Sequence, residues 1–190
     1  MENVKILAVV GMSGSGKSTA IKYLEEKGIP SVYFGGVIYK AMEEAGIERT
    51  EDGESEKIFR QEIRKKEGKD FVVLRAIQYA KNLIEAGQRR IVLDGLYSWT
   101  EYKILKKEFP GIMTTVALVC DKRLRHKRVG DRQDRAFDKQ AINERDYSEI
   151  ENLEKGGPIA IADYYLLNNG TIEELYEDVG KLMRKIGFLE

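Results

Sequence analysis

Eight residues near the start of the chain, from Gly11 to Ser18, contain three glycines, three serines, a methionine and a lysine, in the order Gly-Met-Ser-Gly-Ser-Gly-Lys-Ser. They match the phosphate-binding pattern G-x-x-x-x-G-K-[ST] at every fixed position. Because glycine lacks a Cβ, the backbone can curl and bring its N–H groups close to an anion. We expect Lys17 to reach the β- and γ-phosphates of a nucleotide and the Ser18 hydroxyl to ligate Mg²⁺.

A second candidate for chemistry is Asp94, which ends the apolar run Ile91 to Leu93. A carboxylate at the end of such a run can hold Mg²⁺ through water or accept a proton from the attacking group. An aspartate there also commonly serves as a cap or a turn residue, and the pattern alone leaves both interpretations open. Beside the phosphate-binding stretch, we expect Asp94 to act in catalysis and to share the metal with Ser18.

The densest positive charge lies between Lys122 and Arg135, where seven lysines and arginines occur. A phosphoryl group in transfer spreads negative charge over its equatorial oxygens, and arginines that close over it stabilise that charge. We expect Arg128, Arg132 and Arg135 to form such a catalytic lid. The alternative is a solvated charged helix with internal ion pairs. No aromatic residue is interleaved among the basic ones, which argues against a nucleic-acid site.

The elements that must position these residues alternate between strands and helices. We predict strands at residues 4–10, 31–34, 91–95, 114–120 and 164–167. We predict helices at residues 18–26, 37–45, 56–66, 71–86, 100–108 and 138–154, a helical turn at 159–163, and a last helix capped by Thr171 and Glu174. This alternation favours an α/β fold with a mostly parallel five-stranded sheet and helices on both faces. Ligands bind at the carboxyl ends of such strands, where the phosphate-binding stretch and Asp94 would meet.

The chain as a whole is electrically balanced, with 32 basic and 32 acidic residues among 190. This balance argues against a general nucleic-acid or membrane-surface binder, and no apolar run approaches the length of a membrane span. The single cysteine, Cys120, excludes an internal disulfide and suits a reducing cytoplasm. We therefore expect a cytoplasmic protein with one domain over residues 1–190, an acceptor-binding excursion at 35–86 and a lid at 122–150.

In combination, these motifs resemble the P-loop kinases of the nucleoside-monophosphate kinase and dephospho-CoA kinase type, most closely the archaeal adenylate-kinase-related branch. The resemblance rests on Gly11 to Ser18, Asp94-Gly95-Leu96 with Ser98, Arg64 with Gly68 and Arg75, the arginine-rich lid, Arg145-Asp146 with Glu149 or Glu151, and the run from Ala160 to Thr171. It implies a three-layer P-loop fold and transfer of a phosphoryl group from ATP, with Mg²⁺, to a small nucleotide-like acceptor.

The resemblance also implies roles for residues outside the phosphate-binding stretch. It places Asn168 and Gly170 near the adenine. The residues expected to bind the nucleotide are Gly11, Ser13, Gly14, Ser15, Gly16, Lys17, Ser18, Thr19, Asn168 and Gly170. The residues expected to bind the acceptor are Arg64, Arg75, Tyr39 and Tyr97.

Three positions depart from the pattern of the resembled family. Gly36 stands where relatives commonly have an aspartate, and Tyr39 and Tyr97 stand where they often have arginines. A carboxylate and two cations expected on the acceptor side are therefore missing. Two functions remain open: phosphoryl transfer from ATP to a small acceptor, and an ATP-binding sensor or regulatory protein that has lost acceptor chemistry.

Overall fold

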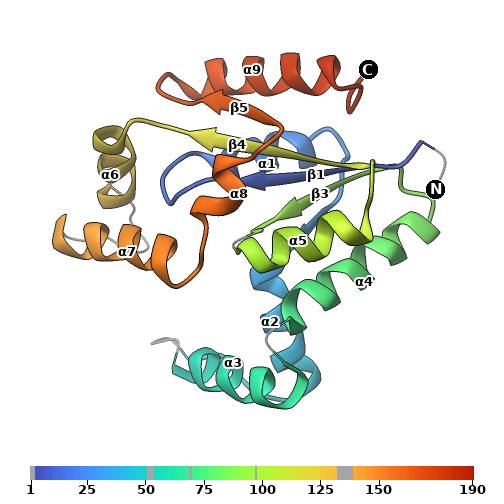
Figure 1. Cartoon of the computed structure of the whole chain (residues 1–190), viewed down its shortest axis with the longest axis vertical. Coiled ribbons are helices and arrows are strands. Elements are labelled where there is room, and N and C mark those ends of the chain that lie inside the picture. Colours follow the sequence, from blue (N-terminus) through green and yellow to red (C-terminus); the bar gives the residue numbers. More distant parts are fainter. Residues whose placement is uncertain (1–2, 51–53, 69, 97, 132–138) are drawn as a thin grey trace.

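A five-stranded parallel sheet forms the centre of the molecule (Figure 1). The computed structural model describes residues 3–50, 54–68, 70–96, 98–131 and 139–190. The strands are β1 (Lys5–Val10), β2 (Ser31–Tyr33), β3 (Arg90–Asp94), β4 (Met113–Val119) and β5 (Tyr164–Leu167). They lie in the order β2-β3-β1-β4-β5, and every pairing among them is parallel. The predicted α/β class is confirmed, with a sheet that is wholly rather than mostly parallel.

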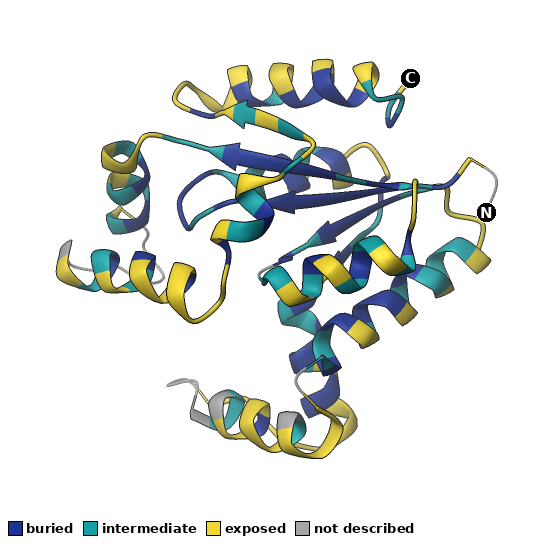
Figure 2. Ribbon diagram, viewed as in Figure 1, coloured by how far each residue is buried: buried dark blue, intermediate teal, exposed yellow. Residues whose placement is uncertain are grey.

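Helices cover both faces of this sheet, and alternate residues of β1 serve the two faces. Leu7 joins an apolar cluster with residues of α1 and α9, whereas Ile6 and Ala8 join another with residues of α2, α4 and α5. Figure 2 shows the central strands almost wholly buried and the exposed residues on the outer sides of the helices. These helices are α1 (Lys17–Glu25), α2 (Phe34–Glu44), α4 (Phe71–Glu85), α5 (Trp99–Glu108) and α9 (Ile172–Lys185).

The register of the sheet brings the ends of three strands together. Asp94, the last residue of β3, is paired with Val9 of β1 on one side and with Tyr33 of β2 on the other. Because the strands are parallel, their carboxyl ends lie along one edge of the sheet. The segment that follows β1 therefore starts beside Asp94.

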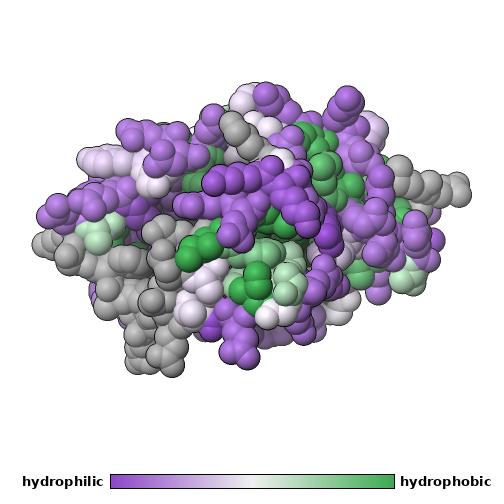
Figure 3. All heavy atoms as spheres, turned by 90° about the horizontal axis from the view of Figure 1, so that it is seen from below, coloured by the Kyte–Doolittle hydropathy of each residue, from purple (hydrophilic) through white to green (hydrophobic). Residues whose placement is uncertain are grey.

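Four further described helices lie beyond the five named above. They are α3 (Glu54–Glu67), α6 (Lys122–Gly130), α7 (Lys139–Glu151) and the short α8 (Gly156–Ala160), which packs beside α5 and β4. Most described residues of α3 are exposed, and Phe59 is the buried one that joins the core. Figure 3 views the molecule from the α3 side and shows hydrophilic residues around a smaller group of hydrophobic ones. No helix in the described ranges is long and apolar enough to cross a membrane.

Two glycine pairs lie inside helices, although the sequence predicts helix starts after them, at residues 37 and 159. Helix α2 includes Gly35 and Gly36, and α8 includes Gly156 and Gly157. A Cβ added at Gly35 would lie 2.9 Å from Cε1 of Tyr33, so the glycine lets that ring lie over the start of α2. In α8, proline is tolerated in the first turn because the N–H that it lacks would have no helical partner there.

Candidate functional site

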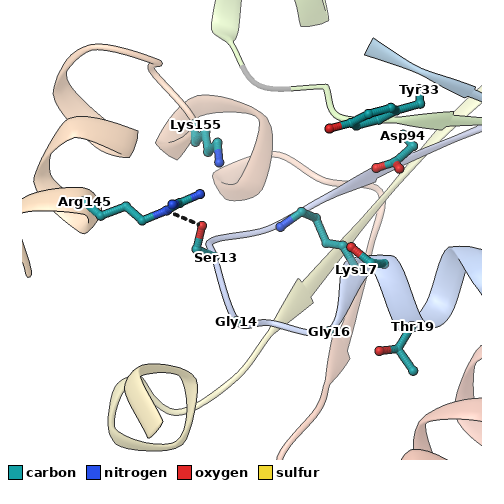
Figure 4. Close-up of a pocket in the computed structure, with 10 residues that line it drawn as sticks. Ser13, Gly14, Gly16, Lys17, Thr19, Tyr33, Asp94, Arg145 and Lys155 are labelled. Atoms are coloured by element: carbon teal, nitrogen blue, oxygen red, sulfur yellow. Dashed lines mark hydrogen bonds between the residues drawn. The ribbon is translucent and has the colours of Figure 1, made fainter. Parts of the chain in front are cut away.

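The phosphate loop, which we define as residues 11–18, curls between β1 and the N-terminus of α1 (Figure 4). Gly14 and Gly16 have φ values of 81° and 101°, in the left-handed region that favours glycine. A Cβ added at Gly14 would lie 2.6 Å from the carbonyl oxygen of Arg125, and one at Gly16 would collide with the side-chain amide of Asn168. Glycine is therefore needed at both positions, for conformation and for space.

A cavity of about 310 Å³ opens over this loop. Figure 4 shows Arg145 and Lys155 on one side of it, Asp94 and Tyr33 on the other, and Lys17 between them. The residues that line it are Ser13, Gly14, Gly16, Lys17, Ser18, Thr19, Tyr33, Asp94, Arg145 and Lys155. The structure thus brings together the expected phosphate, metal and catalytic residues Lys17, Ser18 and Asp94.

Lys17 and Asp94 form the electrostatic centre of the cavity. The Lys17 ammonium donates to the carbonyl oxygens of Gly11 at 2.8 Å and Met12 at 3.1 Å, so the lysine lies along its own loop. Burial raises the pKa of Asp94, and the positive charge of Lys17 opposes that increase only in part. A partly buried carboxylate of raised basicity suits either role predicted for Asp94, binding a cation or accepting a proton.

A buried ion pair braces the phosphate loop from outside. The Arg125 guanidinium of α6 donates to both carboxylate oxygens of Asp146 in α7, at 2.8 and 2.7 Å, and to the carbonyl oxygen of Ser13 at 2.9 Å. His126 Nε2 lies 2.7 Å from the same carboxylate. Burial alone would raise the pKa of Asp146, but the hydrogen bonds from Arg125 and His126 outweigh it and lower the pKa. Arg125 and His126 of the basic segment are therefore held in contacts inside the protein, and Arg125 supports the phosphate loop.

A second buried pair reaches the loop from α7. The Glu149 carboxylate accepts hydrogen bonds from the Ser13 N–H, with 3.0 Å between N and Oε2, and from the Ser13 hydroxyl. The Lys155 ammonium lies 2.9 Å from Glu149, and Arg145 Nε donates to the Ser13 hydroxyl at 3.0 Å. Burial would raise the pKa of Glu149, but Lys155 and Ser13 lower it below its ordinary value. Sequence reasoning reached Arg145 and Glu149 only through the family resemblance and missed Lys155.

We expect the free energy of unfolding to fall in acid because Asp146 and Glu149 both have lowered pKa values. Their folded-state pKa lies below that of the unfolded chain, so the stabilisation is complete above about pH 4.5 and is lost as the pH falls through the folded values. Urea titrations between about pH 7 and about pH 3 measure this loss. Asp146→Asn should make the free energy of unfolding fall less steeply in acid, whereas Asp178→Asn on the exposed side of α9 should not change this decrease. An unchanged decrease in Asp146→Asn would show that Asp146 does not contribute to it.

The residues expected near the adenine lie on the other side of the loop from Asp94. Asn168 donates from its side-chain amide to the carbonyl oxygen of Ser15 at 2.8 Å, and a cavity of about 280 Å³ adjoins it. Arg128 lines this second cavity and donates to the carbonyl oxygens of Asn168 and Gly170, at 2.8 and 3.1 Å. It does not line the phosphate cavity, as a lid residue would. Arg132 and Arg135, the other expected lid residues, lie outside the described residues.

Among the residues expected to bind the acceptor, the described Arg75 and Tyr39 do not line the phosphate cavity. Arg75 forms an ion pair with Glu44 at 3.3 Å, and Tyr39 lies under the Arg49 guanidinium, 4.0 Å from the ring centre. Both therefore serve contacts around α2 and the segment that follows it. Tyr97 and the side chain of Arg64 lie outside the described parts of the structure.

A third cavity, of about 250 Å³, adjoins the phosphate cavity and shares Tyr33, Arg145 and Lys155 with it. Its remaining wall combines Arg60 with apolar and acidic residues. These are Phe34, Gly35, Ile38, Val72, Glu101, Glu149 and Leu153. A molecule held there would lie next to one held over the phosphate loop.

Within the described residues, no group of three or more His, Cys, Asp or Glu side chains could hold a metal ion. A cation over the loop would therefore depend on Ser18, Asp94 and the oxygens of a bound phosphate or of water. This is the coordination that Mg²⁺ usually adopts beside nucleotides, where it keeps few protein ligands.

Comparison with known proteins places the chain among nucleotide-binding folds. The model of an AAA domain matches residues 7–155. A UPF0200 protein of Thermococcus kodakarensis is 32% identical over 184 residues, which cover 95% of this chain and 97% of that protein. Shikimate kinase from Bacteroides thetaiotaomicron superposes with a TM-score of 0.61 at 12% identity, covering 95% and 98% of the two chains. Dephospho-CoA kinase from Campylobacter jejuni superposes with a TM-score of 0.59 at 17% identity, covering 97% of this chain and 98% of that chain. Both similarities show a P-loop kinase-like fold.

Proposed function

This chain belongs to the UPF0200 family and contains an AAA domain, and we propose that it transfers the γ-phosphoryl group of ATP to a small acceptor. The observation that carries the proposal is the pair of adjoining cavities. One lies over the phosphate loop with Lys17 and Asp94, and the other shares Tyr33, Arg145 and Lys155 with it. Two bound molecules would meet at this shared wall, which is what direct transfer between them requires.

The side chains around the loop fit a nucleotide with Mg²⁺. The left-handed Gly14 and Gly16 let the loop curl, and the N–H groups at the start of α1 could then bind phosphate oxygens. Ser18 and Asp94 would hold the Mg²⁺, which when bound would neutralise part of the phosphate charge. Lys17 would bind the β- and γ-phosphates.

The base and the acceptor would lie on opposite sides of the loop. We place the adenine in the cavity beside Asn168, with Thr19 and Arg128 in its wall. We place the acceptor in the third cavity, where Arg60 offers a positive charge. Arg145, which lies between donor and acceptor, would stabilise the charge that spreads over the transferring oxygens.

A panel of acceptors tests the proposal. We expect one acceptor among nucleoside monophosphates, dephospho-CoA and shikimate to raise ADP formation from Mg·ATP by about tenfold or more over ATP alone, with the phosphorylated product identified by mass spectrometry. With that acceptor, Arg60→Ala should raise its KM, since Arg60 lines the acceptor cavity. The matched control is Arg75→Ala, because Arg75 is paired with Glu44 away from that cavity.

Tight ATP binding without ADP formation for any acceptor would instead favour the sensor. The observation that favours a sensor is that Tyr39 and Arg75, expected to bind an acceptor, instead contact Arg49 and Glu44. An Arg75→Ala variant with a raised acceptor KM and an Arg60→Ala variant without one would contradict the placement of the acceptor.

A further inference from the structure

A buried carboxylate occupies hydrogen-bond donors of the phosphate loop. Glu149, 3% exposed, accepts from the N–H and the hydroxyl of Ser13. Oriented N–H groups in such a loop are the donors that phosphate oxygens use. In this structure a side-chain anion from α7 therefore makes the kind of bond that a phosphate would make.

The γ-phosphate of ATP would approach this contact, and the phosphates of ADP would not need to. Lys17 reaches the β- and γ-phosphates in loops of this type. Its ammonium lies against the carbonyl oxygens of Gly11 and Met12, directly before Ser13 in the chain. A γ-phosphate held by Lys17 would therefore face the Ser13–Glu149 contact, and two anions repel strongly in a partly dry cavity.

Two positively charged side chains lie beside Glu149, where they could bind a phosphate that replaced its carboxylate. Lys155, 6% exposed, is paired with Glu149 at 2.9 Å and lines the phosphate cavity. Arg145 lines the same cavity and donates to the Ser13 hydroxyl. A γ-phosphate that replaced the carboxylate at Ser13 would meet both positive charges.

We propose that Glu149 determines how the loop distinguishes nucleoside triphosphates from diphosphates, an inference that rests on the proposed binding of ATP by the same loop. Without a triphosphate, the Glu149 carboxylate occupies Ser13 and neutralises Lys155. A γ-phosphate displaces the carboxylate from Ser13, and Lys155 and Arg145 then face the phosphoryl group. A diphosphate leaves the Ser13–Glu149 contact in place.

Trp99, the single tryptophan of the chain, is placed to report the displacement. A Cβ added at Gly157 of α8 would lie only 2.8 Å from Cε3 of Trp99, so the indole is packed on the helix that begins directly after Lys155. A shift of the Glu149–Lys155 pair is expected to move α8 against this ring. Mg·ATP should therefore change the tryptophan fluorescence, and Mg·ADP should change it little.

Calorimetric titrations of the full chain with Mg·ATP and with Mg·ADP test the proposal through the ratio Kd(ADP)/Kd(ATP). We expect Glu149→Gln to raise the ratio about tenfold, because it removes the competing charge. We expect Lys155→Met to lower the ratio, because it removes a cation that only the triphosphate meets. The matched control is Glu151→Gln, an exposed change of the same charge on the same helix, which should leave the ratio unchanged.

If Glu149 only supported the loop structurally, the ratio Kd(ADP)/Kd(ATP) would not change in opposite directions in the two variants. In that case Glu149→Gln would weaken the binding of both nucleotides equally. An unchanged ratio with intact ATP binding therefore overturns this inference but not the proposed function. If Glu149→Gln fails to fold, the double variant Glu149→Gln/Lys155→Met, which removes both charges of this pair, must have a higher ratio than Lys155→Met. An equal ratio overturns the inference. A wild-type chain that binds neither nucleotide would overturn the proposed function as well.

Discussion

Lys17→Ala is expected to lower the rate of phosphoryl transfer by about 10²- to 10³-fold while the chain stays folded. The Lys17 side chain lines the phosphate cavity, and its ammonium is the cation that partly offsets the raised pKa of Asp94. In the structure it donates to carbonyl oxygens of Gly11 and Met12, so its removal costs stability of only about 1–2 kcal/mol. Steady-state kinetics with saturating acceptor measure the rate, and thermal unfolding checks the fold.

The matched control is Lys22→Ala, five residues further along α1. The Lys22 side chain is 70% exposed and has only a 4.0 Å ion pair with Glu26, so its loss should leave the rate unchanged. Full activity in Lys17→Ala would rule out the proposed mechanism. An equal loss in both variants would point to an effect on α1 rather than on the phosphates.

The phosphate loop could be predicted from the sequence because its chemistry depends on local spacing. Glycines that adopt φ values favourable to glycine, followed by a lysine and a serine at the start of a helix, leave few alternatives within eight residues. The neighbouring Asp94 could be placed because parallel strands end at one edge, and the register pairs it with Val9, two residues before the loop. These predictions needed only short-range geometry and one rule of topology.

The wall of the third cavity could not be predicted because it depends on how helices face each other. Arg60 and Arg75 lie on successive helices and look equivalent in sequence. Packing of α3 and α4 against α2 places Arg60 in the wall of the third cavity and Arg75 against Glu44. The sequence pattern gives the helices, but not which arginine the packing brings to the cavity.

In the basic segment, residues 122–135, the sequence likewise did not predict which charged side chains are buried and paired. Its residues were open to two interpretations, a lid or a solvated helix, and Arg125 fits neither. The partner of Arg125 is Asp146, 21 residues away, and Glu149 contacts Ser13 across 136 residues. No spacing rule relates such positions, and hydropathy describes both helices simply as charged.

Asp146→Asn is expected to lower the free energy of unfolding by about 3–5 kcal/mol, because it leaves the Arg125 guanidinium buried without a countercharge. The Arg125 and Asp146 side chains are each only 9% exposed, so water replaces little of what is lost. Asparagine keeps the shape of the side chain and one acceptor oxygen, so the effect reports the charge rather than a cavity. Urea unfolding at neutral pH measures it, with Asp178→Asn on α9 as the exposed control.

The same variant should also weaken nucleotide binding, because Arg125 donates to the carbonyl oxygen of Ser13 and its own carbonyl lies close to Gly14. A guanidinium that turns toward water to recover solvation would release that brace and loosen the loop. Arg125→Met in the Asp146→Asn background should recover much of the stability, since neither member of that pair is then charged, but should not recover the affinity. Recovery of both would show that the brace on Ser13 has no part in binding. A stability loss no greater than that of Asp178→Asn would show that Arg125 and Asp146 are paired only at the surface.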